Sequence, residues 1–443
     1  MAPGNLHPFN LSTQQWHSFS CGSHLTRAEP QDYFFEEVNL AHNEHNPLVY
    51  DAKRRMYRTA SKKGYPTLRT VYTYVKNRLT LGLLPSGVTS NYLRYMKWRL
   101  IQRYCKSILH VLGTTSLLMG LGINNRASRK TLTAATTSHW ILKDILGKAV
   151  RVLWASRMGS SFDCDAKRWR FRASLIFMVG SALEMACRIF PAFFLLLASL
   201  GKACQQVSML TTSSTRTVFY QALSENNNNI GDVTAKGEAQ IAIVSVLGMF
   251  SGIAVCQRIG ASLGAVLVVY SLLQILELVS AYMQLRAVEF KVLNMERLNI
   301  IVNEYVMGKE LSKPAQVAQT ERIFLPAPRL RFSRLAYRQL NPEVLKEDLN
   351  LFKGEEYAFT TCCKTPKILL RPKADTLVVV KAVLSCTFFE NGADLSEAVE
   401  RASTEISKLI AAIRKKGWYS PDSIAFDIPS RLEWTIPSDS TLG

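Results

Sequence analysis

The residues with the clearest chemical potential are charged side chains set between apolar segments in residues 138–240. Asp163 and Asp165 form a close carboxylate pair, followed at once by Lys167 and Arg168. Two carboxylates at this spacing could bind a divalent cation, although two ligands alone are a weak signal for one. Capping of a helix by Asp165, with a salt bridge to Lys167 or Arg168, is the simpler interpretation of the same residues.

Other charged residues recur through the same stretch. Ionisable groups among apolar segments are costly, so they usually have partners or a function. Asp165 and Asp232 are each placed to open a helix, and helix N-termini attract anions. We predict that one set of residues converges near a single membrane face, as a structural charge cluster or as a binding site for an anionic group: Lys143, Asp144, Asp163, Asp165, Arg168, Arg216, Asp232 and Lys236.

Three ionisable residues are predicted to lie inside membrane-embedded helices: Glu184, Arg188 and Glu277. Glu184 and Arg188 are four residues apart, which places them on one helix face, where they can pair. Such a pair would offset part of the cost of burying either charge.

The apolar segments are long enough to cross a membrane, which takes roughly 20 residues per helix. Residues 239–256 and 261–283 are predicted to form an antiparallel transmembrane hairpin. Residues 171–200 are predicted to be a broken span or a membrane-buried helix pair, with a kink or stop at Pro191. Residues 107–123 are shorter and fit a half-span or a buried helix. Glycines four residues apart, at 248 and 252 and at 260 and 264, predict close approach of helix backbones.

The charge balance indicates anionic partners. Lys and Arg number 54 against 34 Asp and Glu, a net charge of +20, which suits a phospholipid surface or nucleic acid. Residues 51–106 combine this basic charge with interleaved tyrosines. That pattern is shared by proteins that grip single-stranded nucleic acid and by helices seated at a membrane interface. The apolar segment that follows favours the interface.

Cysteine and histidine usage predicts no metal site and no cofactor. The nine cysteines have no CxxC spacing, and all seven histidines lie at or before His139. A Cys/His zinc site needs a closer grouping. The chain also has no nucleophile elbow, Walker loop or HExxH spacing, so the sequence indicates no particular reaction.

The predicted fold class is mainly α, a multi-helix membrane-embedded unit followed by a small α+β C-terminal domain. Residues 1–50 are predicted to be a flexible N-terminal arm without a secretory signal, 51–310 the helical unit, 311–330 a linker and 331–443 the C-terminal domain. Within that domain we predict strands at 356–361 and 367–370. Residues 375–388 fit either a strand or a helix, and we predict a helix. A further helix is predicted at 395–416, ended by Gly417.

Several motifs carry a resemblance to a known family. They are Trp140–Asp144, Phe162–Trp169, Phe190-Pro191 and Asp232–Lys236, with Leu84–Leu93 upstream and Gly417-Trp418 downstream. In this order they resemble the root UV-B sensitive (RUS) family over roughly residues 81–434. The resemblance implies a membrane-associated family found across eukaryotes, whose plant members are linked to seedling development, UV-B response and auxin transport. It implies no established reaction.

The leading functional hypothesis is a non-enzymatic integral membrane protein that scaffolds, or carries a small anionic solute or lipid. Its expected partners are membrane lipid, an anionic small molecule, and a second copy of this chain or a related family member. The expected location is a membrane. A basic nucleic-acid-binding protein is the alternative, although nucleic acid is the disfavoured partner. A membrane-bound enzyme using Asp163 or Asp165 is the third hypothesis.

Overall fold

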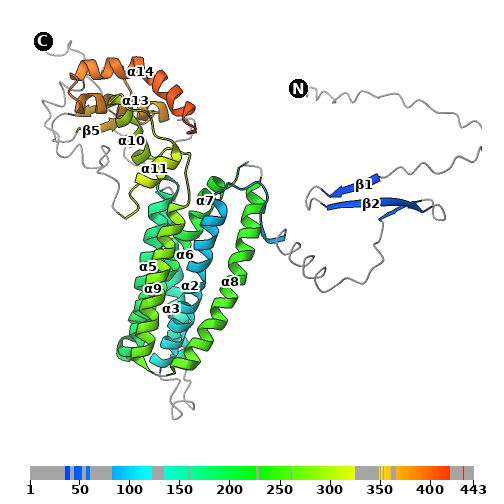
Figure 1. The fold of residues 1–443 in the computed structure, drawn as a ribbon. Helices are drawn as coiled ribbons and strands as arrows, with labels where there is room; N and C mark the ends of the chain where they lie inside the picture. The colour runs from blue at the N-terminus through cyan, green and yellow to red at the C-terminus, as the bar shows by residue number, and fades with distance from the viewer. Residues whose placement is uncertain are drawn as a thin grey trace, which may run out of the picture. The chain divides into compact units, whose positions relative to one another are not determined.

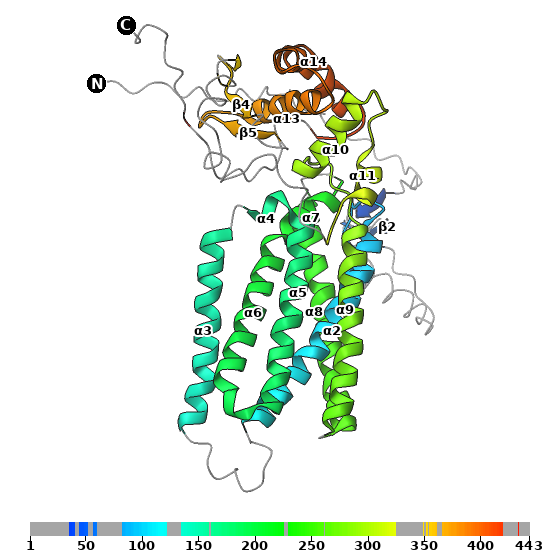
Figure 2. The ribbon, with the colours of Figure 1, turned by 90° about the vertical axis from the view of Figure 1, so that its left-hand side faces the viewer.

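Long helices between residues 92 and 286 run side by side, and a smaller α+β part follows them in the chain (Figures 1 and 2). The chain divides into two units, residues 1–77 and 78–443. The computed structural model describes residues 35–39, 44–51, 56–59, 82–121, 134–158, 161–225, 229–260, 262–324, 349, 351–352, 354–360, 366–419 and 433.

The first unit contains an antiparallel sheet of order β1-β2-β3. Strand β1 (Phe35–Asn39) pairs with β2 (Glu44–Asp51), which pairs with β3 (Met56–Thr59). Strand β1 and all but the last residue of β2 lie within residues 1–50, where the sequence predicted a flexible arm. Their sequences, FEEVN and EHNPLVYD, lack the alternation of apolar and polar residues that identifies a strand.

Helix α2 (Tyr92–Gly120) is the central helix of the second unit, packed against α5 (Ala166–Ile189), α8 (Ile230–Ile259) and α9 (Leu263–Arg286). The segment 107–123 was predicted to be a half-span or a buried helix, and its residues 107–120 form the second half of α2. Its buried residues include Leu109, Leu112 and Leu117. The sequence therefore identified a buried helix but not that it continues a longer one.

The break predicted at Pro191 is confirmed. Helix α5 ends at Ile189, a 3-10 turn η2 (Pro191–Phe193) follows, and α6 (Phe194–Ser214) returns along α5. Proline lacks the backbone N–H that a continuing helix would use. A short α7 (Arg216–Leu223) follows α6. Helix α3 (Ala134–Met158) lies at the edge of the bundle against α6 (Figure 2), and α4 (Ser161–Cys164) leads into α5.

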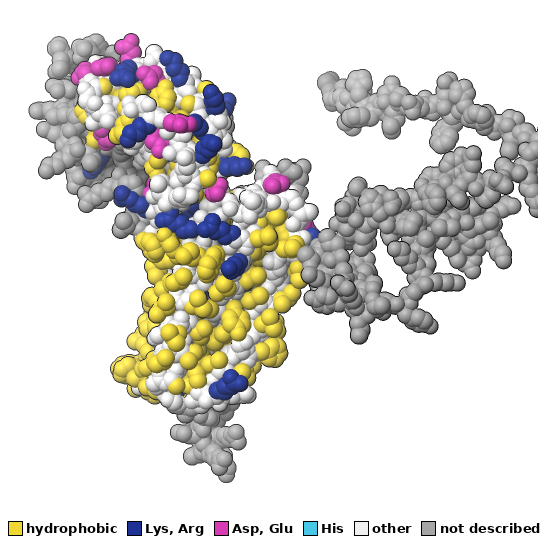
Figure 3. Space-filling model, in the orientation of Figure 1, with side chains coloured by type: hydrophobic (Ala, Val, Ile, Leu, Met, Phe, Trp, Pro, Cys, Tyr) yellow, Lys and Arg dark blue, Asp and Glu magenta, His cyan; other side chains and the backbone are white. Residues whose placement is uncertain are grey.

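Three helical stretches in the described part of the chain are long and apolar enough to cross a membrane: Pro191–Leu223, Ile230–Ile259 and Leu263–Arg286. Their outward side chains are apolar as well: Phe250 is 67% exposed and Leu272 is 62% exposed. Figure 3 shows hydrophobic side chains over this face of the bundle, with Lys and Arg at its margins. The α+β part shows both signs of charge among its surface residues.

The glycine-spacing prediction is half confirmed. A Cβ at Gly248 would lie 2.7 Å from Ser107 Cβ and 2.9 Å from the Tyr104 carbonyl oxygen, so α8 approaches α2 closely there. Gly252 makes a similar approach to Val111. Gly264 and Gly260 have no atom within 4 Å of a Cβ position. Gly260 instead ends α8 with φ of 59°, a conformation that favours glycine.

The C-terminal part is a small α+β module. It contains α10 (Met295–Val306), α11 (Pro314–Thr320), the antiparallel strands β4 (Tyr357–Thr360) and β5 (Lys367–Leu370), α13 (Thr376–Glu390) and α14 (Leu395–Lys415). These confirm the two strands and two helices predicted from the sequence, including the end of α14 before Gly417, whose φ is 87°.

The core of this module extends further toward the N-terminus than the predicted domain boundary. Leu298, Ile301 and Val302 of α10, with Val317 of α11, pack in one cluster with Val380 and other residues of α13. These residues were assigned to the helical unit and to the linker. Leu293 is the first residue of this cluster along the chain. The boundaries at 310 and 330 stay predictions.

Gly248→Ala is expected to destabilise the bundle by about 1–3 kcal/mol, because the added methyl group meets the backbone of α2. The measurement is chemical unfolding of the purified full chain in detergent. Gly264→Ala is the matched control, since its methyl group enters open space and alanine favours a helix over glycine. Equal unfolding midpoints for the two variants would contradict the close approach of α8 and α2.

Candidate functional site

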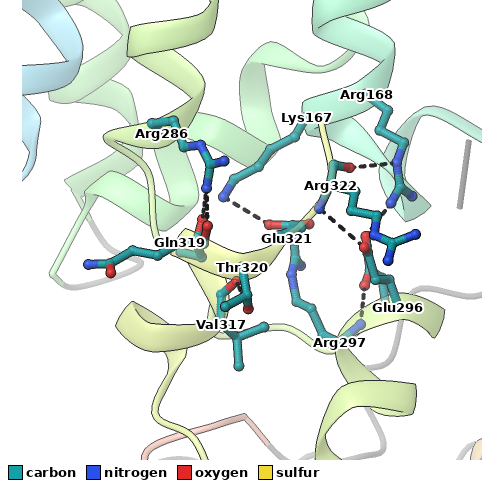
Figure 4. Close-up of polar contacts among 12 residues, drawn as sticks. Lys167, Arg168, Arg286, Glu296, Arg297, Val317, Gln319, Thr320, Glu321 and Arg322 are labelled. Carbon is teal, nitrogen blue, oxygen red and sulfur yellow. Dashed lines mark hydrogen bonds and ion pairs between the residues drawn. The ribbon is translucent and has the colours of Figure 1, made fainter. Parts of the chain in front are cut away.

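The start of α5 carries a group of buried charges that links the bundle to the C-terminal module (Figure 4). Arg168 Nη1 donates to Asp165 Oδ2 at 2.6 Å, its Nε donates to the Arg322 carbonyl oxygen at 3.0 Å, and its Nη2 donates to Glu296 of α10. Arg168 is 3% exposed. One arginine therefore joins α5, α10 and the segment after α11.

Lys167, the preceding residue, forms the second half of the group. Its Nζ lies 2.9 Å from Glu321 Oε2, and Arg297 Nη2 lies 2.6 Å from Glu321 Oε1. Burial raises the pKa of Glu321, but Arg297 and Lys167 outweigh it and lower the pKa to about 2. Arg286 at the end of α9 adds hydrogen bonds to the carbonyl oxygens of Ala318 and Gln319. We refer to this set as the charged joint: Asp165, Lys167, Arg168, Glu296, Arg297 and Glu321.

A pocket of about 340 Å³ lies beside the charged joint. The N-terminal ends of α5 and α10 contribute to its wall, which suits an anion. Asn294 caps α10 by accepting from Arg297 N, but Asp165 makes no such capping bond at α5 and is paired with Arg168 instead. Asp165 therefore occupies the N-cap position of α5, as predicted, but its side chain does not form the predicted capping hydrogen bond. The lining residues are Asp163, Cys164, Ala166, Thr217, Val218, Gln221, Phe290, Val292, Leu293, Asn294 and Arg297.

The structure distributes the predicted set over separate ion pairs. Asp165 pairs with Arg168, while Asp163 lies exposed on the pocket wall. Arg216 opens α7 and lies 3.1 Å from Glu238. Asp232 and Lys236 pair at 3.0 Å within the first turns of α8. These six residues all lie where α5, α7 and α8 begin.

Lys143 and Asp144 lie elsewhere, partway along α3. Their side chains pair at 2.8 Å, and Lys202 of α6 lies 3.7 Å from the same carboxylate oxygen. Lys143 also stacks over the Trp140 ring at 4.1 Å. This cluster links α3 to α6.

The three residues predicted to be intramembrane ionisable groups lie inside or at the end of the bundle helices. Glu277 is fully buried, 3.1 Å from Lys106 Nζ, and accepts from Gln102 Nε2 at 2.7 Å. Glu184 accepts from Gln205 of α6 at 2.7 Å, so the structure gives it a partner outside its own helix. Arg188 is half-buried in the last turn of α5.

Sequence reasoning named Lys167 only as a possible partner of Asp165, and it missed Glu296, Arg297 and Glu321 of the charged joint, and Lys106 and Gln102 of the bundle interior. Lys167 and Glu321 are 154 residues apart, and no local pattern links them. Lys106 had a usable signal, because it falls seven residues after Arg99 on the buried face of α2. Within the described ranges, no three His, Cys, Asp or Glu side chains form a group that could hold a metal ion.

Comparisons with known proteins agree with one another. Residues 73–309, more than half of the 443-residue chain, match the family model described as "Vitamin B6 photo-protection and homoeostasis domain". The chain is 28% identical over 365 residues to "Protein root UVB sensitive 2, chloroplastic" of Arabidopsis thaliana, covering 79% of this chain and 82% of the relative. No solved structure matches the chain.

Other relatives are matched over a shorter part of their length. "Protein root UVB sensitive 4" of Arabidopsis thaliana is 31% identical over 248 residues, 55% of this chain and 46% of the relative. "RUS family member 1" of Dictyostelium discoideum is 29% identical over 243 residues, which cover 54% of this chain and 45% of the relative. The chain thus spans about half the length of these two relatives.

Glu321→Gln is expected to destabilise the protein by about 3–5 kcal/mol, because it leaves Lys167 and Arg297 buried without their carboxylate. Unfolding of the purified chain measures the change. Glu397→Gln on α14 is the matched control: its pair with Arg401 is exposed, and such pairs contribute less than about 1 kcal/mol. Equal effects would show that the charged joint does not hold the module.

The same carboxylate predicts a pH dependence. The ordinary pKa of Glu321 is 4.5, and its folded value is about 2. Its stabilisation, on the order of 3 kcal/mol, is therefore fully present above pH 4.5 and is lost as the pH falls toward 2. The unfolding free energy of the wild type should fall over this interval by more than that of Glu321→Gln, and parallel curves would contradict the assignment.

Proposed function

This chain belongs to the root UVB sensitive family, and we propose that it is a non-enzymatic integral membrane protein that carries a small anionic solute or lipid. The bundle would lie in the lipid phase and the C-terminal module in water. A scaffold would share this placement without binding a solute. The family shows no reaction, so the argument depends on the chain's own surface and interior.

The single observation that carries the proposal is the arrangement of polarity in the bundle. Large apolar side chains point outward along α8 and α9, among them Phe250, Ile253, Leu272 and Ile275, each 47% to 67% exposed. Charged and amide side chains point inward, including Glu277 and Gln284, both fully buried. A water-soluble protein has the opposite arrangement, and contiguous apolar surface of this extent is typical of a membrane contact.

The anionic character of the solute is supported by charge. The chain carries a net charge of +20, and Figure 3 shows Lys and Arg at the margins of the apolar surface. Such residues favour anionic lipid headgroups and phosphate. The pocket beside the charged joint adds Arg297 and two helix N-termini, although Asp163 on its wall opposes an anion.

The family description supplies the first solutes to test. It names vitamin B6, and phosphorylated B6 vitamers are small anions of the class proposed here. The alternative of a nucleic-acid-binding protein requires no lipid contact. The alternative of an enzyme requires chemistry at Asp163 or Asp165, and Asp165 is engaged with Arg168.

We expect alkaline carbonate to leave the full chain in the membrane fraction, because the apolar surface requires lipid. Cysteines placed near Ile230 and near Arg286, at the outer ends of α8 and α9, should be labelled from the same side of the membrane. Release of the chain by carbonate would support the nucleic-acid alternative. Labelling of the two ends from opposite sides would contradict the hairpin.

We expect Thr217→Phe to reduce the anionic small molecules or lipids that copurify with the chain, since Thr217 lines the pocket and its exposed side chain has room to change. Mass spectrometry of the purified protein, with phosphorylated B6 vitamers as standards, gives the measurement. Thr404→Phe on the exposed face of α14 is the matched control. Identical copurifying molecules in both variants and in the wild type would contradict a carrier that uses this pocket, and an absence of bound molecules in all three would favour a scaffold.

A further inference from the structure

Three arginines gather where α2, α5 and α7 meet, and none of the three lines the pocket. Arg99 is 8% exposed and Arg170 is 3% exposed, and Arg216 is half-buried. Arg170 lies close enough to Arg99 and Arg216 for their positive charges to repel one another. Arg103, one turn beyond Arg99, adds a further positive charge and donates to Ser245 Oγ at 2.6 Å.

The protein partners of Arg170 are neutral. Its guanidinium donates to the Thr212 carbonyl oxygen at 3.3 Å, to Thr215 Oγ1 at 3.4 Å and to Tyr95 OH at 3.4 Å. It also stacks over the Phe219 ring at 4.9 Å. A buried charge normally has an opposite charge beside it, and none of these groups supplies one.

One carboxylate, Glu238 of α8, lies near this set. It is 3.1 Å from Arg216 Nη1 and accepts from Tyr220 OH at 3.3 Å. Its charge also acts on Arg99. Asp232 and Lys236 neutralise each other nearby. Among the described residues, Glu238 is the one carboxylate within ion-pair distance of Arg99, Arg170 or Arg216, so these three arginines carry a net positive charge at this end of the bundle.

Several donors in the same place lack an acceptor. The buried Tyr92 OH, Arg99 Nε and Arg216 Nε form no hydrogen bond of normal geometry among the described residues, although Gln240 lies beside the Tyr92 hydroxyl. Tyr92 is 1% exposed. Buried donors are nearly always satisfied, so unmet donors indicate a missing acceptor. Bound water could accept from one donor, but water does not offset the positive charge.

We propose that Tyr92, Arg99, Arg170 and Arg216 form a binding site for a phosphate group, belonging either to a small solute or to a phospholipid headgroup. The guanidinium fork of arginine matches the oxygens of a phosphate group, and each guanidinium carries five N–H donors. The tyrosine hydroxyl adds a neutral donor. This inference rests on the proposed function and specifies the anion that the bundle accepts.

The site explains why these charges are tolerated. Arg99 lies seven residues from the start of α2, about 10 Å along the helix axis, and Arg170 lies in the second turn of α5. Both are near the end of the bundle where the charged joint lies, within reach of a headgroup or of a solute entering from that side. Phosphate brings the negative charge and the acceptors that the protein itself omits.

The test uses the purified full chain in detergent, titrated with inorganic phosphate while its thermal midpoint and heat of binding are measured. Phosphate should raise the midpoint of the wild type. Arg99→Gln and Arg170→Gln should weaken phosphate binding at least tenfold. Without phosphate, their midpoints should equal or exceed that of the wild type, because each change relieves repulsion. Arg258→Gln, at an exposed arginine near the other end of α8, should bind as the wild type does.

Tyr92→Phe keeps the test decisive if an arginine variant fails to fold. It removes a buried hydroxyl that forms no hydrogen bond of normal geometry, so its midpoint without phosphate should not fall, while phosphate binding should weaken about fivefold. A purely structural cluster predicts lower midpoints for the arginine variants and no change in phosphate response for Tyr92→Phe. That pattern, or an absence of any phosphate response in the wild type, would overturn the proposal.

The same preparation distinguishes a phospholipid headgroup from a small solute as the source of the phosphate group. Phosphorus analysis of the delipidated chain, followed by thermal titration with phosphatidic acid in mixed micelles, detects a headgroup. A response to inorganic phosphate without bound lipid phosphorus identifies a solute. Either response, lost in Arg170→Gln, supports the site. Release of the chain by carbonate with phosphate binding intact would overturn the membrane placement alone, and retention in the membrane without any phosphate response would overturn this site alone.

Discussion

The inward face of α2 is the constraint on which the bundle depends. Gln102 donates to Ser174 of α5 at 2.9 Å and to Glu277 of α9 at 2.7 Å, and it accepts from Gln284 at 2.6 Å. Tyr104 bonds Ser251 of α8 at 2.7 Å. Polar groups in an apolar setting are costly when unpaired. Each neighbouring helix must therefore place a polar side chain level with its partner on α2, measured along the bundle axis.

This constraint explains both the packing and the outward surface of the bundle. Because the polar side chains lie in the bundle interior, the outward residues of α8 and α9 are mainly large and apolar, which suits contact with lipid. Glycine permits the remaining close contact, since Gly248 brings α8 against the backbone of α2. The charged joint follows the same rule at the start of α5, where Lys167 and Arg168 each pair with a carboxylate of the C-terminal module. The module is thus held to the bundle by pairs that neither part could satisfy alone.

The sequence predicted the features of the fold that depend on neighbouring residues, such as where helices run, break and end. Hydrophobic length predicted the helices of the hairpin, Pro191 predicted the break before α6, and the glycine at 417 predicted the end of α14. Residues 375–388 were ambiguous because α13 is buried on nearly all sides, so its apolar residues show no helical period. The charged set was predicted to converge near one membrane face; in the structure most of its members form ion pairs, and the pair of Lys143 with Asp144 lies apart on α3. Which charges pair depends on contacts such as Lys167 with Glu321, which only the folded chain brings together.

The same limit separates the two pairs of glycines. Gly248 and Gly264 have equal spacing to a second glycine, yet only Gly248 faces a neighbouring backbone. Spacing identifies helix faces, whereas the rotation of each helix about its axis follows from the whole interior. The buried arginines were hidden for the same reason, since Arg99 and Arg170 lie 71 residues apart (170 minus 99) in otherwise unrelated segments.

The most direct measurement of the account is a spin-label depth profile along α8 in lipid nanodiscs. Single labels would replace the outward residues Ile243, Leu247, Phe250 and Ile253 and the inward residue Ser245. Collision with oxygen, which concentrates in the lipid core, should peak at the outward positions and fall at Ser245, while a water-soluble nickel reagent should reach none of the outward positions. Free access of the nickel reagent to Phe250 and Ile253 would contradict a bundle that faces lipid.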